Sequence, residues 1–149
     1  MKKVTIVCVG KIKEQYFRDG IAEYVKRLGR YCKVDIVELK DFATPDAVKK
    51  ESDLILERLG GGYKILMDIG GKQLGSEEVA SLLERAYVSA PDVTFVIGGS
   101  CGVDERVRSA CDFRLSFGKV TYPHQLMRLI LCEQIYRAFC ITEGTPYHK

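Results

Sequence analysis

The sequence predicts an α/β fold, a parallel sheet flanked by helices, and three observations support it. Short apolar runs rich in β-branched residues alternate with longer segments whose apolar residues recur every three or four positions. The runs are near-continuous, as in strands buried on both faces of a parallel sheet. Most runs stop at or near a glycine, which suits a tight turn. At 149 residues, the chain 1–149 has the size of a single domain.

The N-terminal half is expected to hold two strands and two helices. The strands cover residues 3–9 and 34–39, and the helices lie around 17–28 and 45–59. Gly10 ends the first strand, and Gly29 lies just past the helix that follows it. Pro45 suits the first turn of the second helix because its φ is already set near the helical value.

The C-terminal half is expected to hold three strands and three helices. The strands cover 63–69, 93–97 and 114–117, and the helices lie around 76–88, after 104 and over 124–140. Ser76 is a good N-cap, and Glu77 and Glu78 place negative charge in the first turn, where the helix dipole favours it. Asp104 can cap the short helix in the same way.

Composition limits the classes of function. The hydrophobic content of 46% and charged content of 29% are those of an ordinary soluble protein, and no run approaches a membrane span. The basic N-terminus lacks a cleavage site, so it is interpreted as a strand of a cytoplasmic protein. A net charge of +3 permits a nucleic-acid partner without requiring one.

Metal chemistry is not expected. The six cysteines form no C-x-x-C pair and lie mostly within apolar patterns, as buried thiols do, and they stand at positions 8, 32, 101, 111, 132 and 140. Only two histidines accompany them. No metal site and a reducing compartment are therefore expected.

The last helix is apolar over an unusually wide arc. On a helical wheel centred on Arg128, apolar side chains span roughly 220°, against about 100° for a helix that covers one core. Leu131 and Ile135 lie within this arc, whereas Glu133 and Arg137 lie opposite. A homodimer with this helix at the interface would bury the arc, and a helix at the centre of a single domain is the alternative.

Two strand ends stop at loops that could hold a ligand. Residues 98–102 follow the strand at 93–97, and residues 118–124 follow the strand at 114–117. Because ligands of parallel sheets sit outside the carboxyl ends of the strands, these loops are the expected site. The second loop, with its hydroxyls and backbone, suits a flat polar molecule such as a nucleoside.

Familiar motifs are few. Neither the G-x-G-x-x-G of dinucleotide sites nor a P-loop is present. Gly98 to Gly102 match G-x-S-x-G, so Ser100 is a candidate nucleophile of a small serine hydrolase, with Asp112 and either His124 or His148 as partners. Gly102 and Val103 make a poor start for the helix that such an elbow requires.

The C-terminal tripeptide Tyr147, His148 and Lys149 combines an aromatic ring, an imidazole and a cation. Such a set suits stacking on a base and contacting phosphate. A frayed end is the alternative, although Pro146 stiffens the segment.

Motifs spread over the whole chain resemble the RlmH family of bacterial rRNA methyltransferases. They are Val9-Gly10-Lys11, Glu23-Tyr24-x-x-Arg27, Phe95-Val96-Ile97-Gly98-Gly99-Ser100-x-Gly102, Leu115-Ser116-x-x-x-x-Thr121-x-Pro123-His124-x-x-x-Arg128, Glu133-Gln134-x-Tyr136-Arg137-Ala138 and Pro146-Tyr147-His148-Lys149. The resemblance implies the SPOUT class, whose members are homodimers with a C-terminal trefoil knot that binds S-adenosylmethionine.

The resemblance also implies a site. The cofactor-binding residues carried over are Met67, Gly98, Phe117, Gly118, Lys119, Val120, Thr121 and Tyr122. Cys101 and Met67 depart from the residues common in the family, but neither change removes a backbone contact.

The activity implied is methylation of N3 of a pseudouridine in 23S rRNA, with rRNA in the ribosome as the expected partner. The sequence leaves open whether free rRNA, the large subunit or the assembled ribosome is the substrate. The candidate catalytic residues are His148, as proton acceptor or orienter, and Arg137 and Lys149, which could stabilise charge on the uracil oxygens. A serine hydrolase and a non-catalytic RNA-binding protein remain the alternatives.

Overall fold

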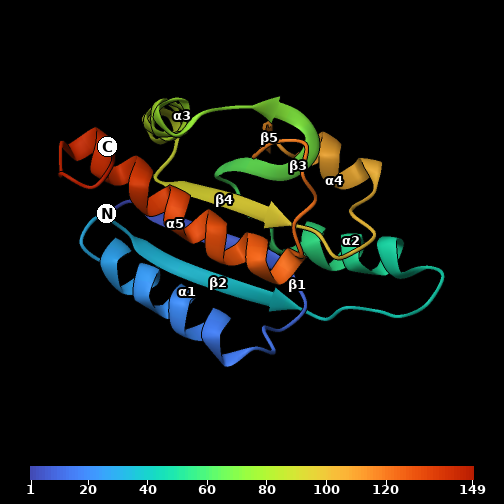
Figure 1. Cartoon of the computed structure of the whole chain (residues 1–149). Helices are drawn as coiled ribbons and strands as arrows, with labels where there is room; N and C mark the ends of the chain where they lie inside the picture. The colour runs from blue at the N-terminus through green and yellow to red at the C-terminus, as the bar shows by residue number, and fades with distance from the viewer.

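The structure is a computed structural model that describes all 149 residues. Five strands alternate with five helices, as the sequence predicted (Figure 1). The elements are β1 (Lys3–Val9), α1 (Gln15–Leu28), β2 (Lys33–Leu39), α2 (Ala47–Arg58), β3 (Tyr63–Gln73), α3 (Ser76–Ser89), β4 (Asp92–Ile97), α4 (Glu105–Ala110), β5 (Phe113–Ser116) and α5 (His124–Glu143). None of the helices is long and apolar enough to span a membrane.

The strands form one parallel sheet in the order β2-β1-β4-β3-β5. Apolar residues of α1, α3 and α5 cover one face of this sheet, and those of α2 and α4 cover the other. All carboxyl ends of the strands therefore meet at one edge, where the two predicted loops lie. The trefoil knot implied by the resemblance stays a prediction.

β3 differs from its expected length. The sequence predicted a strand that ends at Ile69 before two glycines, but β3 continues to Gln73. Its pairing with β5 is interrupted, because Leu115 is opposite both Met67 and Lys72. A side chain at Gly71 would lie 2.6 Å from the Arg114 carbonyl oxygen, so glycine permits this close approach. The residues between, 68–71, form an excursion at the carboxyl edge.

α5 is more deeply buried in its own chain than the dimer interpretation assumed. Leu131 and Ile135 have no exposed surface and belong to the core between α5 and the sheet. The idea that a partner must cover these two side chains is therefore wrong, since α1 and α3 flank the helix and the sheet lies beneath it (Figure 1). Leu126 and Ile130 are half-buried and lie outside the core contacts.

Four of the six cysteines are buried, as predicted: Cys8, Cys32, Cys132 and Cys140. Cys111 is half-buried and Cys101 is exposed. Burial raises the pKa of Cys8 to about 12 and that of Cys132 to about 12. These two thiols are therefore protonated and unreactive at neutral pH.

Candidate active site

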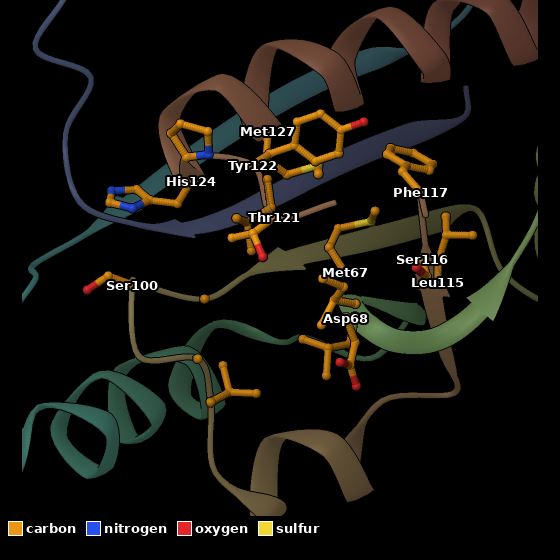
Figure 2. Close-up of a pocket in the computed structure, with 18 of the residues that line it drawn as sticks. Met67, Asp68, Ser100, Leu115, Ser116, Phe117, Thr121, Tyr122, His124 and Met127 are labelled. Carbon is orange, nitrogen blue, oxygen red and sulfur yellow. The ribbon is translucent and has the colours of Figure 1, made fainter. Parts of the chain in front are cut away.

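A cavity of about 670 Å³ opens at the carboxyl edge of β3, β4 and β5, against the start of α5 (Figure 2). This volume lies within the range of small-molecule sites. Its walls come from the β3 excursion, the loop after β4, the loop after β5 and the first turn of α5. The cavity therefore lies where the two strand-end loops predicted a site.

Most of the predicted cofactor residues line this cavity. They are Met67, Gly98, Phe117, Gly118, Val120, Thr121 and Tyr122. Lys119 does not line it; its side chain is exposed and lies outside the cavity wall. In Figure 2, Met67, Phe117, Thr121 and Tyr122 come together from β3 and the loop after β5.

The sequence interpretation missed several lining residues. Asp68 and Ile69 belong to the β3 excursion, whose irregular pairing no periodicity indicated. Arg108 comes from α4, and Met127 comes from the first turns of α5. The pair of glycines at 70 and 71 was the one available signal for the excursion.

The loop after β4 is tightly packed at Gly98. A Cβ on this residue would lie 2.9 Å from Val103 Cγ1 and 3.2 Å from the Gly102 carbonyl carbon. An isolated antiparallel bridge between Gly99 and Gly102 closes the loop. The sequence suggested that the missing side chain of Gly98 leaves room for a ligand. In the structure, Val103 and Gly102 of the same loop occupy that space.

Two buried polar side chains of α2 lie next to this loop, and one of them, Ser52, bonds to the segment that follows it. Glu51 is 4% exposed, and its Oε2 accepts a hydrogen bond of 2.9 Å from the Phe42 amide. A Cβ on Gly99 would lie 2.6 Å from Glu51 Oε1. Ser52 Oγ accepts a bond of 3.0 Å from the Asp104 amide. Asp104 in turn caps α4, as predicted, by accepting from two amides of the first turn.

The loop after β5 is fixed by the side chain of Ser116, the last residue of that strand. Ser116 Oγ donates to the Gly118 carbonyl oxygen at 3.0 Å and accepts from the Gly118 amide at 3.1 Å. Gly118 has a φ of 113°, a backbone conformation that residues with a side chain rarely adopt. The apolar and aromatic side chains of the wall suit a flat heterocycle such as adenine. Asp68 is the only carboxylate on the wall. It accepts from the Gly70 amide at 3.0 Å and lies 3.6 Å from Arg114, so a cationic ligand would share it with these groups.

The serine hydrolase interpretation does not fit this geometry. Ser100 follows the carboxyl end of β4, whereas Asp112 precedes β5, at the opposite edge of a parallel sheet. The Asp112 carboxylate accepts a bond of 2.8 Å from the Lys64 amide there. Ser100 Oγ has only the Cys101 sulfur nearby, at 4.0 Å. The nucleophile, base and acid of a triad are therefore not assembled.

Ser100→Ala is expected to leave methyl transfer within about three-fold of wild type, because the hydroxyl holds no partner that the reaction needs. Single-turnover methylation measured beside calorimetric S-adenosylmethionine affinity checks this. Lost activity with unchanged affinity would restore a chemical role for Ser100.

The C-terminal tail is folded onto α5 and is not frayed. Tyr147 donates a bond of 2.7 Å to Glu133 Oε2, which also accepts from Arg137 at 2.6 Å. Arg137 lies 3.0 Å from His148 Nδ1, and its guanidinium lies over the Tyr147 ring. Burial, with Tyr24 and Glu133 as neighbours, raises the pKa of Tyr147, so its hydroxyl remains a donor. The hydrogen bond to Glu133 raises the pKa of Arg137.

The structure thus brings two predicted catalytic residues together, Arg137 and His148, with exposed Lys149 at the chain end. The tail folds back along α5 as far as Arg137, whereas the cavity lies at the N-terminal end of the helix, at His124 and Met127. The rise from His124 to Arg137 is roughly 20 Å at about 1.5 Å per residue. Within one chain, the tail and the cavity are therefore separate.

The described side chains hold no group of three or more His, Cys, Asp or Glu that could bind a metal ion.

A family model described as "Predicted SPOUT methyltransferase" matches residues 1–148. A Clostridium beijerinckii protein named ribosomal RNA large subunit methyltransferase H is 52% identical, over 98% of this chain and 99% of the relative. A protein of that name from Streptococcus equi subsp. zooepidemicus is 49% identical over 99% of each chain.

A solved methyltransferase from Legionella pneumophila with bound cofactor SAM covers 93% of this chain and 66% of its own, at 12% identity and a TM-score of 0.45. That likeness is too weak to support an argument about this chain.

Proposed function

The chain belongs to the SPOUT methyltransferase family, and we propose that it transfers a methyl group from S-adenosylmethionine to N3 of a pseudouridine in 23S rRNA. Two relatives named for methylation of large-subunit rRNA align over nearly the full chain. The observation that carries the proposal in this chain is the cavity at the β3, β4 and β5 edge, lined by seven of the eight predicted cofactor residues. A ribosomal substrate would place its action in the cytoplasm.

The cavity fits S-adenosylmethionine. The loop after β5 offers backbone groups and two aromatic side chains, Phe117 and Tyr122, to an adenosine, and Asp68 offers a carboxylate to a cationic centre. When bound, the cofactor supplies a methyl group that its sulfonium already activates. The chain therefore needs mainly to hold the acceptor nitrogen in line with that methyl group and to remove the N3 proton.

We further propose a homodimer in which the tail of one copy completes the cavity of the other. The tail does not line the cavity of its own chain, because it is docked on Glu133 and Arg137, roughly 14 to 20 Å along α5 from His124. Leu126, Ile130, Glu133 and Arg137 recur at helical spacing and form an outward stripe on α5. Two copies that cross along this stripe would place tail and cavity together.

In this dimer, Arg137 and Lys149 would stabilise charge that develops on the uracil oxygens as N3 loses its proton. His148, held by Arg137, would orient the base. The ring of Tyr147 and the cationic tail also suit a nucleotide partner.

Ile130→Asp is expected to give a folded monomer, because this half-buried side chain lies on the outward stripe. Ile135→Asp, its matched control on the core side of the same helix, is expected to give unfolded or insoluble protein, because it places a charge in the core at a cost of several kcal/mol. Light scattering and circular dichroism measure mass and helicity. A dimeric, fully helical Ile130→Asp would contradict the stripe as the interface.

Methyl transfer from labelled cofactor to intact ribosomes, separate subunits and naked rRNA tests the substrate. We expect transfer to one pseudouridine, with assembled ribosomal particles preferred, since a net charge of +3 gives little electrostatic affinity for RNA alone. Calorimetry separates the alternative of a non-catalytic RNA-binding protein, which would not bind S-adenosylmethionine.

A further inference from the structure

The chain has two histidines, and one of them lines the cofactor cavity without having been assigned a role in methyl transfer. His124 is the first residue of α5, directly after the loop that follows β5. Figure 2 shows its imidazole at the edge of the cavity, on the side where Ser100 lies and away from Phe117. His124 therefore lies where the uracil of a substrate could approach a cofactor bound by the neighbouring loops.

The surroundings of His124 leave its ring available. The His124 imidazole and the Asp41 carboxylate both lie close to Gly10. A Cβ on this glycine would lie 3.5 Å from His124 Nε2 and 3.9 Å from Asp41 Oδ2. Nearby hydrogen bonds join other groups: the Lys13 amide donates to Gln125, and Arg128 donates to the Gly10 carbonyl oxygen.

Arg128 fixes this rim of the cavity. Its side chain is 1% exposed and donates at 2.7 Å to Glu38, which also accepts from the Ile12 amide at 3.1 Å. The loop after β1, the end of β2 and the first turns of α5 are thus tied together. The positions of Gly10 and His124 relative to each other are held by buried charge-assisted bonds.

The second histidine is differently placed. His148 Nδ1 lies 3.0 Å from Arg137 Nη1, and a guanidinium can only donate. Nδ1 is therefore the acceptor, and the proton of the neutral ring is on Nε2, which faces Glu77 Oε1 at 3.6 Å. While Arg137 donates to Nδ1, the ring has no free lone pair to accept a proton. Its Nε2–H can donate to the uracil once the exposed Glu77 side chain moves aside.

We propose that His124 of the cofactor-bearing chain accepts the N3 proton and that His148 acts as a hydrogen-bond donor. This assignment rests on the proposed methyltransferase function. The N3–H bond breaks, its proton goes to a nitrogen of His124, and the N3 electron pair forms a bond to the methyl carbon. The carbon–sulfur bond breaks with its electrons left on sulfur, which gives S-adenosylhomocysteine, and His124 returns its proton to water.

Glutamine substitutions distinguish the two roles, because an amide can donate a hydrogen bond but is a poor base. In single-turnover methylation of ribosomes, His124→Gln is expected to lose at least about 100-fold in rate, while calorimetric affinity for S-adenosylmethionine stays within about three-fold. His148→Gln is expected to keep its rate within about ten-fold of wild type. Added imidazole is expected to restore part of the rate to His124→Ala but none to His148→Ala.

A second measurement does not depend on activity. Long-range ¹H–¹⁵N spectra of histidine-labelled protein contain two rings, and the His148 ring is expected in the Nε2–H tautomer. A proton on His148 Nδ1, a His124→Gln rate within three-fold of wild type, or imidazole rescue at position 148 would each overturn the assignment. A wild-type protein that transfers no methyl group would instead refute the proposed function, and this inference with it.

Discussion

Gly98→Val is expected to weaken S-adenosylmethionine binding by at least about 100-fold, roughly 2.8 kcal/mol. Even the first carbon of the new side chain would meet Val103 at 2.9 Å and the Gly102 backbone at 3.2 Å. Because interiors are close-packed, the loop after β4 must shift, and this loop forms one wall of the cavity. Isothermal calorimetry measures the loss.

A matched glycine separates a local effect from general damage. Gly61 lies in the connection before β3, away from the cavity, and a Cβ there would meet nothing within 4 Å. Gly61→Val is therefore expected to bind the cofactor as wild type does. Unchanged affinity of folded Gly98→Val would mean that the cofactor does not use this cavity.

Removal of Tyr147, His148 and Lys149 is expected to lower methyl transfer to ribosomes by more than ten-fold, at least about 1.4 kcal/mol of transition-state stabilisation. Cofactor affinity should change little, because none of the three tail residues lines the cofactor cavity and each chain keeps its own cavity wall. Some thermal stability should be lost, since Tyr147 bonds to Glu133 and packs edge-on against Tyr136. Kinetics and calorimetry on the same preparation report both.

Mixed dimers test whether the tail acts across the dimer. A Gly98→Val subunit retains its tail, and a truncated subunit retains its cavity, so a heterodimer of these two inactive variants contains one complete site. Activity is expected to reappear when the two proteins are mixed and allowed to exchange subunits. If each variant remains inactive in the mixture while heterodimers form, the tail does not complete the partner's cavity.

Much of the fold could be predicted because its signals are local. Continuous apolar runs marked the five strands, and Asp104 and Gly29 marked helix ends. The cavity followed from two strand ends that stop at glycine-bearing loops. These inferences need only periodicity and the rule that parallel strands share a carboxyl edge.

Features that depend on distant contacts could not be predicted. The excursion in β3 exists because Gly71 packs against the Arg114 carbonyl, a contact over more than forty positions. The wide apolar arc of α5 could not distinguish a partner from the chain's own sheet, and Leu131 and Ile135 belong to the latter. The docked tail depends on Glu133, which pattern analysis treated only as the polar side of the helix.

The most direct test is to incubate the wild-type protein with methyl-labelled S-adenosylmethionine and ribosomes that lack this methylation, and to locate the label in 23S rRNA by mass spectrometry. We predict one labelled nucleotide, a pseudouridine with its new methyl group on N3, and no label when the Gly98→Val variant replaces wild type. Label on ribose, on another base or on ribosomal protein, or no transfer by a protein that binds the cofactor, would contradict the proposed function.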